Sequence, residues 1–458
     1  MTPFKSINPA TGREATSFEE HTPAQVEAIL ADMRNAQRCW RNFRLDERAE
    51  CLRRVADNLA ERAQDYARLI TAEMGKPIGE SLAEITRCAN VCRFYADHGP
   101  AMLAPETPEG APQGARIVHE PLGIVLAVMP WNFPFWQVLR AAAPALLAGN
   151  AFLCKHAPSV TGCSLALEEA LSGVGMSDGL YRALVVRDER VAAVVEDPRV
   201  RAVSLTGSRR AGAAVAEAAG RAVKKCVLEL GGSDPFIVLA DADLDLAVHT
   251  AVGARFYNAG QTCISAKRFL VDRQVVREFE ERLTRSVGLL KMGDPLRPET
   301  RIGPMARADL REALDRQVRG SLDMGARMIL EGGPVPGEGF FYRPAVLAGV
   351  RPGMPVFEEE VFGPVASVTS VDGPGEALRL ANQTRYGLGA SVWTRDLALG
   401  AKLAGNIEAG NVAVNTLLKS DPRLPFGGVK DSGYGRELGR SGLLEFVNAK
   451  VLRLPPGA

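Results

Sequence analysis

The chain has 458 residues, enough for two or three domains that each bury a sizeable core. Lysine and arginine number 55 against 54 for aspartate and glutamate, so no strong net field favours nucleic acid or an anionic membrane surface. A small-molecule substrate is therefore the favoured partner.

The N-terminal residues, MTPFKSINPATGRE, lack the charged start and apolar core of a secretion signal. No apolar run approaches the roughly 18 residues that a membrane-spanning helix needs. The eight cysteines fall at irregular spacing and form neither a disulfide framework nor a metal-binding pair. We therefore expect a cytoplasmic protein with reduced thiols, no membrane partner and no metal site.

Apolar residues at three- and four-residue spacing predict helical structure over residues 23–74 and 78–98, with a Gly-Lys-Pro break between them. The polar, proline-rich segment 104–114 predicts a loop that leads into a strand hairpin.

From residue 123 onward, short apolar strands such as GIVLAVM, AFLCK and RAVSLTGS alternate with helical stretches. This alternation predicts βαβ units and a parallel sheet, and hence an α/β fold. Ligands of such sheets bind at the carboxyl ends of the strands. That edge would contain Trp131 and Asn132, Lys155, Thr206 to Ser208, and Glu229 to Gly232.

Gly207 and Ser208 stand where a strand turns into a helix, and a helix N-terminus attracts phosphate. Lys155 ends a neighbouring strand, so its ammonium group can reach a ribose or phosphate at the same edge. More often, however, such a turn binds nothing and such a lysine only solvates the surface.

The segment MPWNFPFWQVLRAAAPALLAGN predicts a helix with Asn132 as its N-cap. Asn132, Trp136 and Arg140 recur every fourth residue, so an amide, an aromatic ring and a guanidinium group would line one side of a cleft. Two alternatives stay open: Asn132 is simply a cap, and Arg140 pairs with a structural carboxylate.

Glu229 ends an apolar strand beside two glycines, where burial raises the pKa of a carboxyl group toward the range of a general base. A satisfied structural glutamate is the commoner case. Cys263 follows a Gly-Gln-Thr loop, and taken alone it is more often a small buried hydrophobe than a nucleophile.

The motifs PWNFP, LTGS, LELGG, GQTC, EEVFGP and PFGGVKDSGYGRELG occur in an order and spacing that resembles the NAD(P)-dependent aldehyde dehydrogenase superfamily. The resemblance runs from NPATG near residue 8 to the last strand near residue 454. The stretch CVLELGGSDPFIVL and the short N-terminus look most like the bacterial succinate-semialdehyde dehydrogenases of the shorter type.

This resemblance implies two parallel-sheet α/β domains and a small β oligomerisation arm. Residues 1–101 and 125–231 would form the dinucleotide-binding domain, residues 232–444 the catalytic domain, and residues 102–124 and 445–458 the arm. Strands in such an arm have open edges unless another subunit covers them, so a homodimer or homotetramer is expected.

The resemblance also implies the catalytic roles. Cys263 would attack the aldehyde to give a thiohemiacetal, whose oxyanion is held by Asn132 and the Cys263 N–H. Hydride transfer to the nicotinamide would leave a thioester, and Glu229 would activate the water that releases the acid.

For the cofactor, the resemblance assigns Trp131, Lys155, Gly207, Ser208, the backbone of Leu230, and Glu360, with Phe362 packing nearby. Lys155 is followed by His156, Ala157 and Pro158, which are assigned to the same site. Members strict for NAD usually carry a glutamate at the position of Pro158. Without that carboxylate nothing repels a 2′-phosphate, so both NAD and NADP are expected to serve.

For the substrate, the resemblance assigns Arg140 to the carboxylate of succinate semialdehyde, with Trp136 and Tyr257 beside it. Many members carry an arginine at the position of Tyr257, so Arg255 and Ser420 are considered as further helpers.

Three alternatives remain: a dehydrogenase for another aldehyde or semialdehyde, a CoA-acylating relative, and a non-catalytic NAD-binding structural protein. Glu229 disfavours the CoA-acylating relative because release by water needs a base. A structural role would not require Cys263, Glu229, Asn132 and Glu360 together.

Overall fold

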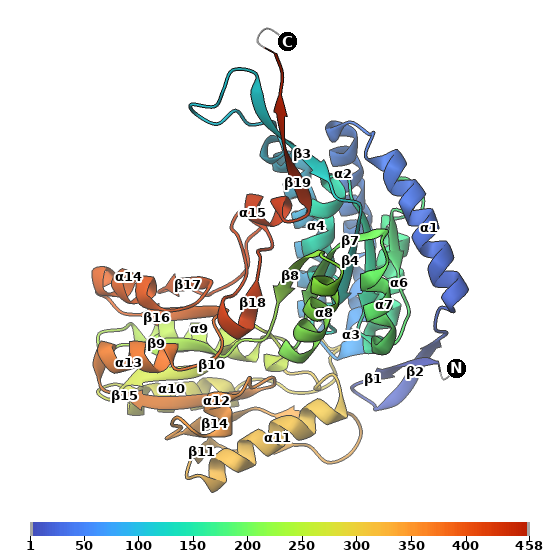
Figure 1. The fold of residues 1–458 in the computed structure, drawn as a ribbon. Helices are drawn as coiled ribbons and strands as arrows, with labels where there is room; N and C mark the ends of the chain where they lie inside the picture. The colour runs from blue at the N-terminus through green and yellow to red at the C-terminus, as the bar shows by residue number, and fades with distance from the viewer. Residues whose placement is uncertain (1–2, 456–458) are drawn as a thin grey trace.

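The N-terminal part of the chain is helical. The computed structural model describes residues 3–455 (Figure 1). Its first elements are β1 (Phe4–Asn8), β2 (Arg13–Phe18), α1 (Pro23–Trp40), α2 (Leu45–Glu61), α3 (Ala63–Met74) and α4 (Ile78–Met102). The helical structure predicted over residues 23–74 is thus three helices, and the β1–β2 hairpin was not predicted. Gly75, at φ +81°, ends α3 in the left-handed conformation that glycine adopts most easily.

A six-stranded sheet, built mainly from the first half of the chain, lies on the right of Figure 1. In the order β18-β8-β7-β4-β5-β6, all neighbours are parallel except β18 with β8. The strands are β4 (Ile124–Met129), β5 (Ala151–His156), β6 (Tyr181–Ala183), β7 (Val200–Thr206), β8 (Lys225–Glu229) and β18 (Gly433–Tyr434). The intervening helices are α5 (Trp136–Leu147), α6 (Thr161–Leu171), α7 (Val191–Glu196) and α8 (Arg209–Arg221). Because β5 and β7 flank β4 on opposite sides, the chain reverses direction there, which opens a crevice at the carboxyl edge.

A seven-stranded sheet, at the lower left of Figure 1, has the order β11-β14-β15-β10-β9-β16-β17. Its strands are β9 (Asp234–Val238), β10 (Ala266–Asp272), β11 (Arg327–Leu330), β14 (Ala345–Ala348), β15 (Val365–Val371), β16 (Gly389–Trp393) and β17 (Asn411–Val414). Its helices are α9 (Leu244–Phe256), α10 (Val276–Gly288), α11 (Ala308–Asp323), α12 (Pro355–Glu358), α13 (Gly373–Asn382) and α14 (Leu397–Asn406). Both faces are covered: Phe236 and Phe269 pack into one core, Ile237 and Leu270 into another.

Two strands far apart in the sequence form the arm that projects at the top of Figure 1. These are β3 (Ala115–Pro121) and β19 (Val447–Arg453), which pair antiparallel. The expectation of a strand hairpin after residue 114 was therefore wrong, because β3 pairs with the C-terminal strand and β4 joins the six-stranded sheet. The remaining short elements are β12 (Gly333–Pro334), β13 (Tyr342–Arg343) and α15 (Gly439–Leu444).

The predicted division into domains stays a prediction. Residues 1–2 and 456–458, at the ends of two predicted ranges, lie outside the described residues. Within the rest, the two large sheets separate near residue 232, but β18, predicted in the catalytic range, returns to the six-stranded sheet. No helix between residues 3 and 455 is both long and apolar enough to span a bilayer.

Candidate active site

Cys263 lies in a tight loop between α9 and β10. Asn258, Ala259 and Gly260 all have left-handed backbone, with φ of 53°, 50° and 72°. A Cβ on Gly260 would lie 2.2 Å from the carbonyl oxygen of Gly363, so only glycine fits there. Left-handed backbone costs of order 1–3 kcal/mol at each non-glycine residue and persists where surrounding contacts enforce it.

Hydrogen bonds from both sides hold this loop. The side chain of Gln261 accepts the N–H of Ala306 at 2.9 Å. From the other side, Lys267 Nζ donates to the carbonyl oxygens of Thr262 and Cys263 at 3.0 and 2.5 Å. The main chain that carries the sulfur is therefore rigidly positioned.

Asn132 is tied to the same loop. Its Nδ2 donates to the carbonyl oxygen of Gln261 at 2.9 Å, and Asn258 Nδ2 donates to the carbonyl oxygen of Asn132 at 2.9 Å. A side-chain amide carries two N–H groups, so the second remains for a substrate oxygen. The oxyanion role of Asn132 stays a prediction, and the structure places its side chain against the backbone next to Cys263.

The interpretation of Asn132 as a helix cap was wrong. Helix α5 begins at Trp136, and the carboxylate of Glu84 on α4 accepts the N–H groups of Phe135 and Trp136 at 2.9 and 3.0 Å. The cap thus comes from another helix, which leaves the Asn132 amide free for the cysteine loop. The predicted ladder holds only for Trp136 and Arg140, one turn apart on α5.

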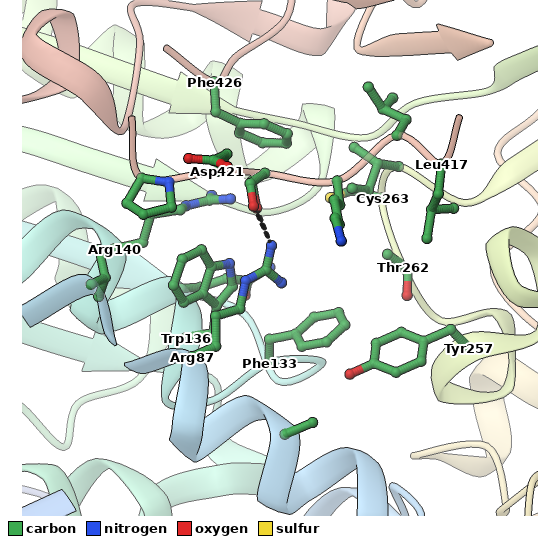
Figure 2. Close-up of a pocket in the computed structure, with 18 of the residues that line it drawn as sticks. Arg87, Phe133, Trp136, Arg140, Tyr257, Thr262, Cys263, Leu417, Asp421 and Phe426 are labelled. Atoms are coloured by element: carbon green, nitrogen blue, oxygen red, sulfur yellow. Dashed lines mark hydrogen bonds between the residues drawn. The ribbon is translucent and has the colours of Figure 1, made fainter. Parts of the chain in front are cut away.

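The Cys263 thiol lines a cavity of about 790 Å³ between α4, α5 and the cysteine loop (Figure 2). Burial raises the pKa of the thiol to about 12, although the positive charges of Arg140 and Lys267 act in the opposite direction. Because the thiolate is the nucleophilic form, this sulfur needs a base at neutral pH.

Glu229 lies at the carboxyl end of β8, almost fully buried. Burial raises the pKa of its carboxyl group to about 8; Arg140 lowers this value and Glu437 raises it. Arg140 Nη2 lies 3.8 Å from Glu229 Oε2, and Arg140 Nε forms a close ion pair with Glu437. A carboxyl group with such a pKa exchanges protons near neutral pH, as a general base must.

Sequence reasoning missed Glu437. The sequence feature that could have indicated it is the lone carboxylate in the glycine-rich segment GYGRELG. In the structure this segment returns to the six-stranded sheet through β18. Its pairing with Arg140 realises the structural alternative left open for that arginine.

The cavity wall contains four residues that the sequence predicted for the substrate and several that it did not. Trp136, Arg140, Tyr257 and Ser420 were predicted; Arg87, Phe133 and Phe426 were missed. Arg255, considered as a helper, is not part of this wall: it is fully buried and donates to the carbonyl oxygens of Val361 and Val365. That expectation was wrong, because the last turn of α9 directs Arg255 into the protein interior.

The residues assigned to the cofactor follow the carboxyl edge of the six-stranded sheet. The rings of Trp131 and Phe362 meet edge to face, with centroids 5.6 Å apart. Glu360 accepts the N–H of Gly232 at 3.1 Å, and a Cβ on Gly231 would lie 2.1 Å from the Glu360 carboxylate. Glycine at position 231 therefore allows the carboxylate to approach the backbone after β8.

The last two residues of β5 have different environments. Lys155 forms an ion pair with the exposed Asp188. His156, by contrast, is buried; burial lowers the pKa of its ring to about 4, and Nε2 contacts the carbonyl oxygen of Pro134 at 2.8 Å. Its Nδ1 accepts the N–H of Ala157 at 2.9 Å, so the assignment of the His156 side chain to the cofactor is corrected.

The start of α8 fits a phosphate group. Ser208 Oγ accepts the N–H of Ala211 at 3.3 Å and caps the helix. A Cβ on Gly207 would meet only a methyl group of Leu205 at 3.7 Å, so the space beside this turn is open. Leu230 packs against Gly212 of α8 and fixes the helix against β8. Free N–H groups and the helix dipole at such a turn suit the phosphates of a dinucleotide.

Comparison with known proteins identifies the family of this chain. The model described as the aldehyde dehydrogenase family matches residues 1–452, and the chain belongs to this family. It is 47% identical over 447 residues to the NAD(P)+ succinate semialdehyde dehydrogenase Sad of Escherichia coli (strain K12), covering 98% of this chain and 97% of that protein. Identity is also 47% with the probable NADP+ succinate-semialdehyde dehydrogenase of Synechocystis, over 98% of both chains.

Solved structures agree. The crystal structure of succinic semialdehyde dehydrogenase from Streptococcus pyogenes in complex with NADP+ matches with a TM-score of 0.95 at 36% identity. The match covers 99% of this chain and 100% of that chain. The family and the α/β fold predicted from the motifs are thereby confirmed.

Proposed function

We propose that the protein oxidises succinate semialdehyde to succinate with NAD+ or NADP+ as the hydride acceptor. The observation that carries the proposal is the cavity into which the Cys263 thiol opens, because the charged side chains of its wall are predominantly cationic. Its charged side chains are Arg87, Arg140, Lys419 and Arg423 against the single acid Asp421. Such a wall favours an aldehyde that bears a carboxylate. Relatives that share nearly the whole chain are named for the same substrate.

In the proposed reaction, Glu229 accepts the proton of the Cys263 thiol, directly or through water, and the thiolate attacks the aldehyde carbon. The free N–H of the Asn132 amide and the Cys263 N–H stabilise the oxyanion of the resulting thiohemiacetal. Bound NAD(P)+ supplies the acceptor for the hydride whose loss converts this adduct into a thioester.

Glu229 releases this first proton to solvent and then takes a proton from water as the water oxygen attacks the thioester carbon. The carbon–sulfur bond breaks, the Cys263 sulfur takes back the proton held by Glu229, and the product loses its own proton and leaves as the carboxylate. Overall, aldehyde, water and NAD(P)+ give carboxylate, NAD(P)H and two protons.

Use of both cofactors follows from the run after Lys155. Pro158, where a glutamate would repel a 2′-phosphate, begins a 3₁₀ turn over residues 158–160 and carries no charge. Lys155 and the start of α8 would hold the ribose and phosphates of either dinucleotide, and Trp131 and Glu360 the nicotinamide end.

We further propose that β3 and β19 mediate assembly into a homodimer or homotetramer, because this two-stranded sheet has open outer edges apart from the bridge between Ile117 and Glu106. Sedimentation analysis tests the assembly. A cytoplasmic location is proposed with it and is tested by cell fractionation.

A panel of aldehydes, each assayed with NAD+ and with NADP+, tests the proposed function. Succinate semialdehyde should give the highest kcat/KM, with succinate as product and no stimulation by CoA. A higher kcat/KM for an uncharged aldehyde of equal length, or formation of an acyl-CoA, would refute the proposal.

A further inference from the structure

Helix α4 supplies a cation to the cavity that the motifs did not point to. Arg87 lies three residues after Glu84, so both side chains occupy one face of the helix, the face turned toward α5. Figure 2 shows Arg87 beside Trp136 on one side of the cavity, with Cys263 and Leu417 on the other.

Two contacts fix the orientation of this guanidinium group. It lies over the ring of Trp136, 4.0 Å from the ring centroid, and Nη2 donates to Ser420 at both its carbonyl oxygen (2.8 Å) and Oγ (2.6 Å). A guanidinium group has five N–H donors, so most of them remain for a ligand. Arg87 is therefore held in place while several of its N–H donors stay available for a ligand.

The charge of Arg87 has no ion-pair partner among residues 3–455. Within this part of the chain its guanidinium group contacts Ser420 and the ring of Trp136, and neither carries a negative charge. Burial lowers the pKa of this group, yet an arginine stays charged at neutral pH. A half-buried guanidinium group without an ion-pair partner is well suited to bind an anionic ligand.

Of the other cations in the cavity wall, the two arginines are already neutralised, and Lys419 is exposed to solvent. Arg140 lies between the carboxylates of Glu229 and Glu437, and a third carboxylate would be repelled by both. Arg423 pairs with Asp421 through two hydrogen bonds of 2.8 and 2.6 Å. Tyr257, at the position where an arginine was expected, is uncharged.

We propose that Arg87, oriented by Trp136 and Ser420, binds the carboxylate of the substrate and is the residue that selects an acid-bearing aldehyde. The aldehyde end of the bound substrate then points across the cavity to Cys263. The proposal gives the carboxylate to a different arginine from the predicted Arg140, and it rests on the proposed function, since it presupposes an acid-bearing substrate.

The test compares succinate semialdehyde with butanal, which has the same carbon chain without the carboxylate. Arg87→Met keeps an unbranched, flexible side chain and removes the charge. The ratio of kcat/KM for succinate semialdehyde to that for butanal should fall roughly 100-fold, mainly through KM. Arg87→Lys should recover part of this loss, because it restores the charge without the planar fork.

Arg93→Met is the matched control: Arg93 lies on the same helix and pairs with Asp57 outside the cavity. It should leave the ratio unchanged. Competitive inhibition by succinate gives a second readout, and its Ki should rise in Arg87→Met. If Arg87→Met folds poorly, Arg87→Gln provides the same comparison.

The outcomes separate two failures. If the wild-type enzyme shows no preference for succinate semialdehyde over butanal, the proposed function fails. If it shows the preference and Arg87→Met retains it, only the assignment of Arg87 is overturned, and the same comparison with Arg140→Met then locates the carboxylate.

Discussion

Arg140 and Glu437 form a buried ion pair, and the same guanidinium group lies 3.8 Å from Glu229. Two carboxylates thus share one cation inside the protein. The proton affinity of each depends on the charge of the other, so titration of the site is that of a coupled group. The pH dependence of catalysis therefore tests this arrangement directly.

Glu437→Gln should lower the pKa of Glu229, since it removes a negative charge that raises this pKa. The inflection of the kcat/KM profile near pH 8 should move by about one unit to lower pH. Glu408→Gln, which removes an exposed carboxylate paired with Lys430, is the control. An inflection that stays in place in Glu437→Gln would show that the two carboxylates do not interact.

Glu229→Gln should block release of the product. We expect kcat to fall by roughly 10²–10⁴-fold, because the glutamine side chain cannot accept a proton from water. Added hydroxylamine should restore part of the turnover, since this strong nucleophile cleaves a thioester without a base. NAD(P)H formation with and without hydroxylamine is the measurement. Failure of hydroxylamine to restore any turnover would mean that the substitution blocks a step before the thioester, such as proton transfer from Cys263, and not release of the product.

Alkylation of Cys263 by iodoacetamide in the ligand-free enzyme should accelerate about tenfold per pH unit between pH 7 and 10, because a pKa near 12 keeps the thiol protonated throughout this range. Peptide mapping by mass spectrometry measures the rate separately from that of the exposed Cys39. A rate that levels off near pH 8 would mean that the thiol is more acidic than its burial implies.

Glu84→Gln should destabilise the protein. Glu84 and Lys76 form an ion pair that is almost completely buried, and the substitution leaves the lysine charge without a partner. The free energy of unfolding should fall by about 3–5 kcal/mol, measured by urea denaturation. The exposed Glu61→Gln should change it by less than about 0.5 kcal/mol. Similar small losses in both variants would show that the buried pair contributes little.

Pro158→Glu should discriminate against NADP+. A carboxylate at this position would repel the 2′-phosphate, so kcat/KM for NADP+ should fall at least roughly tenfold while that for NAD+ changes little. Pro158→Gln is the control, because glutamine is similar in size to glutamate but carries no charge. Equal effects on both cofactors would mean that this position does not face the adenosine ribose.

Local sequence patterns predicted much of the fold. The alternation of strands and helices after residue 123 and the motifs around Cys263 indicated the α/β architecture and the family, both confirmed. These signals are local: strand periodicity, glycine before a tight turn and residues at a strand end each depend on a few neighbours in the chain. The catalytic roles assigned to Cys263, Glu229 and Asn132 stay predictions that the variants above test.

Which side chains and strands pair with each other was decided only by the tertiary structure. The cap of α5 comes from Glu84 rather than Asn132, and the strand after residue 114 pairs with the C-terminus. Likewise Arg140 is neutralised by Glu437, about 300 residues away. Arg87, by contrast, has no ion-pair partner among residues 3–455 and contacts Ser420 and Trp136. The sequence by itself determined which charged and polar groups are available. Only packing decided which of them are paired, because charges meet across segments whose separation in the chain carries no signal of their contact.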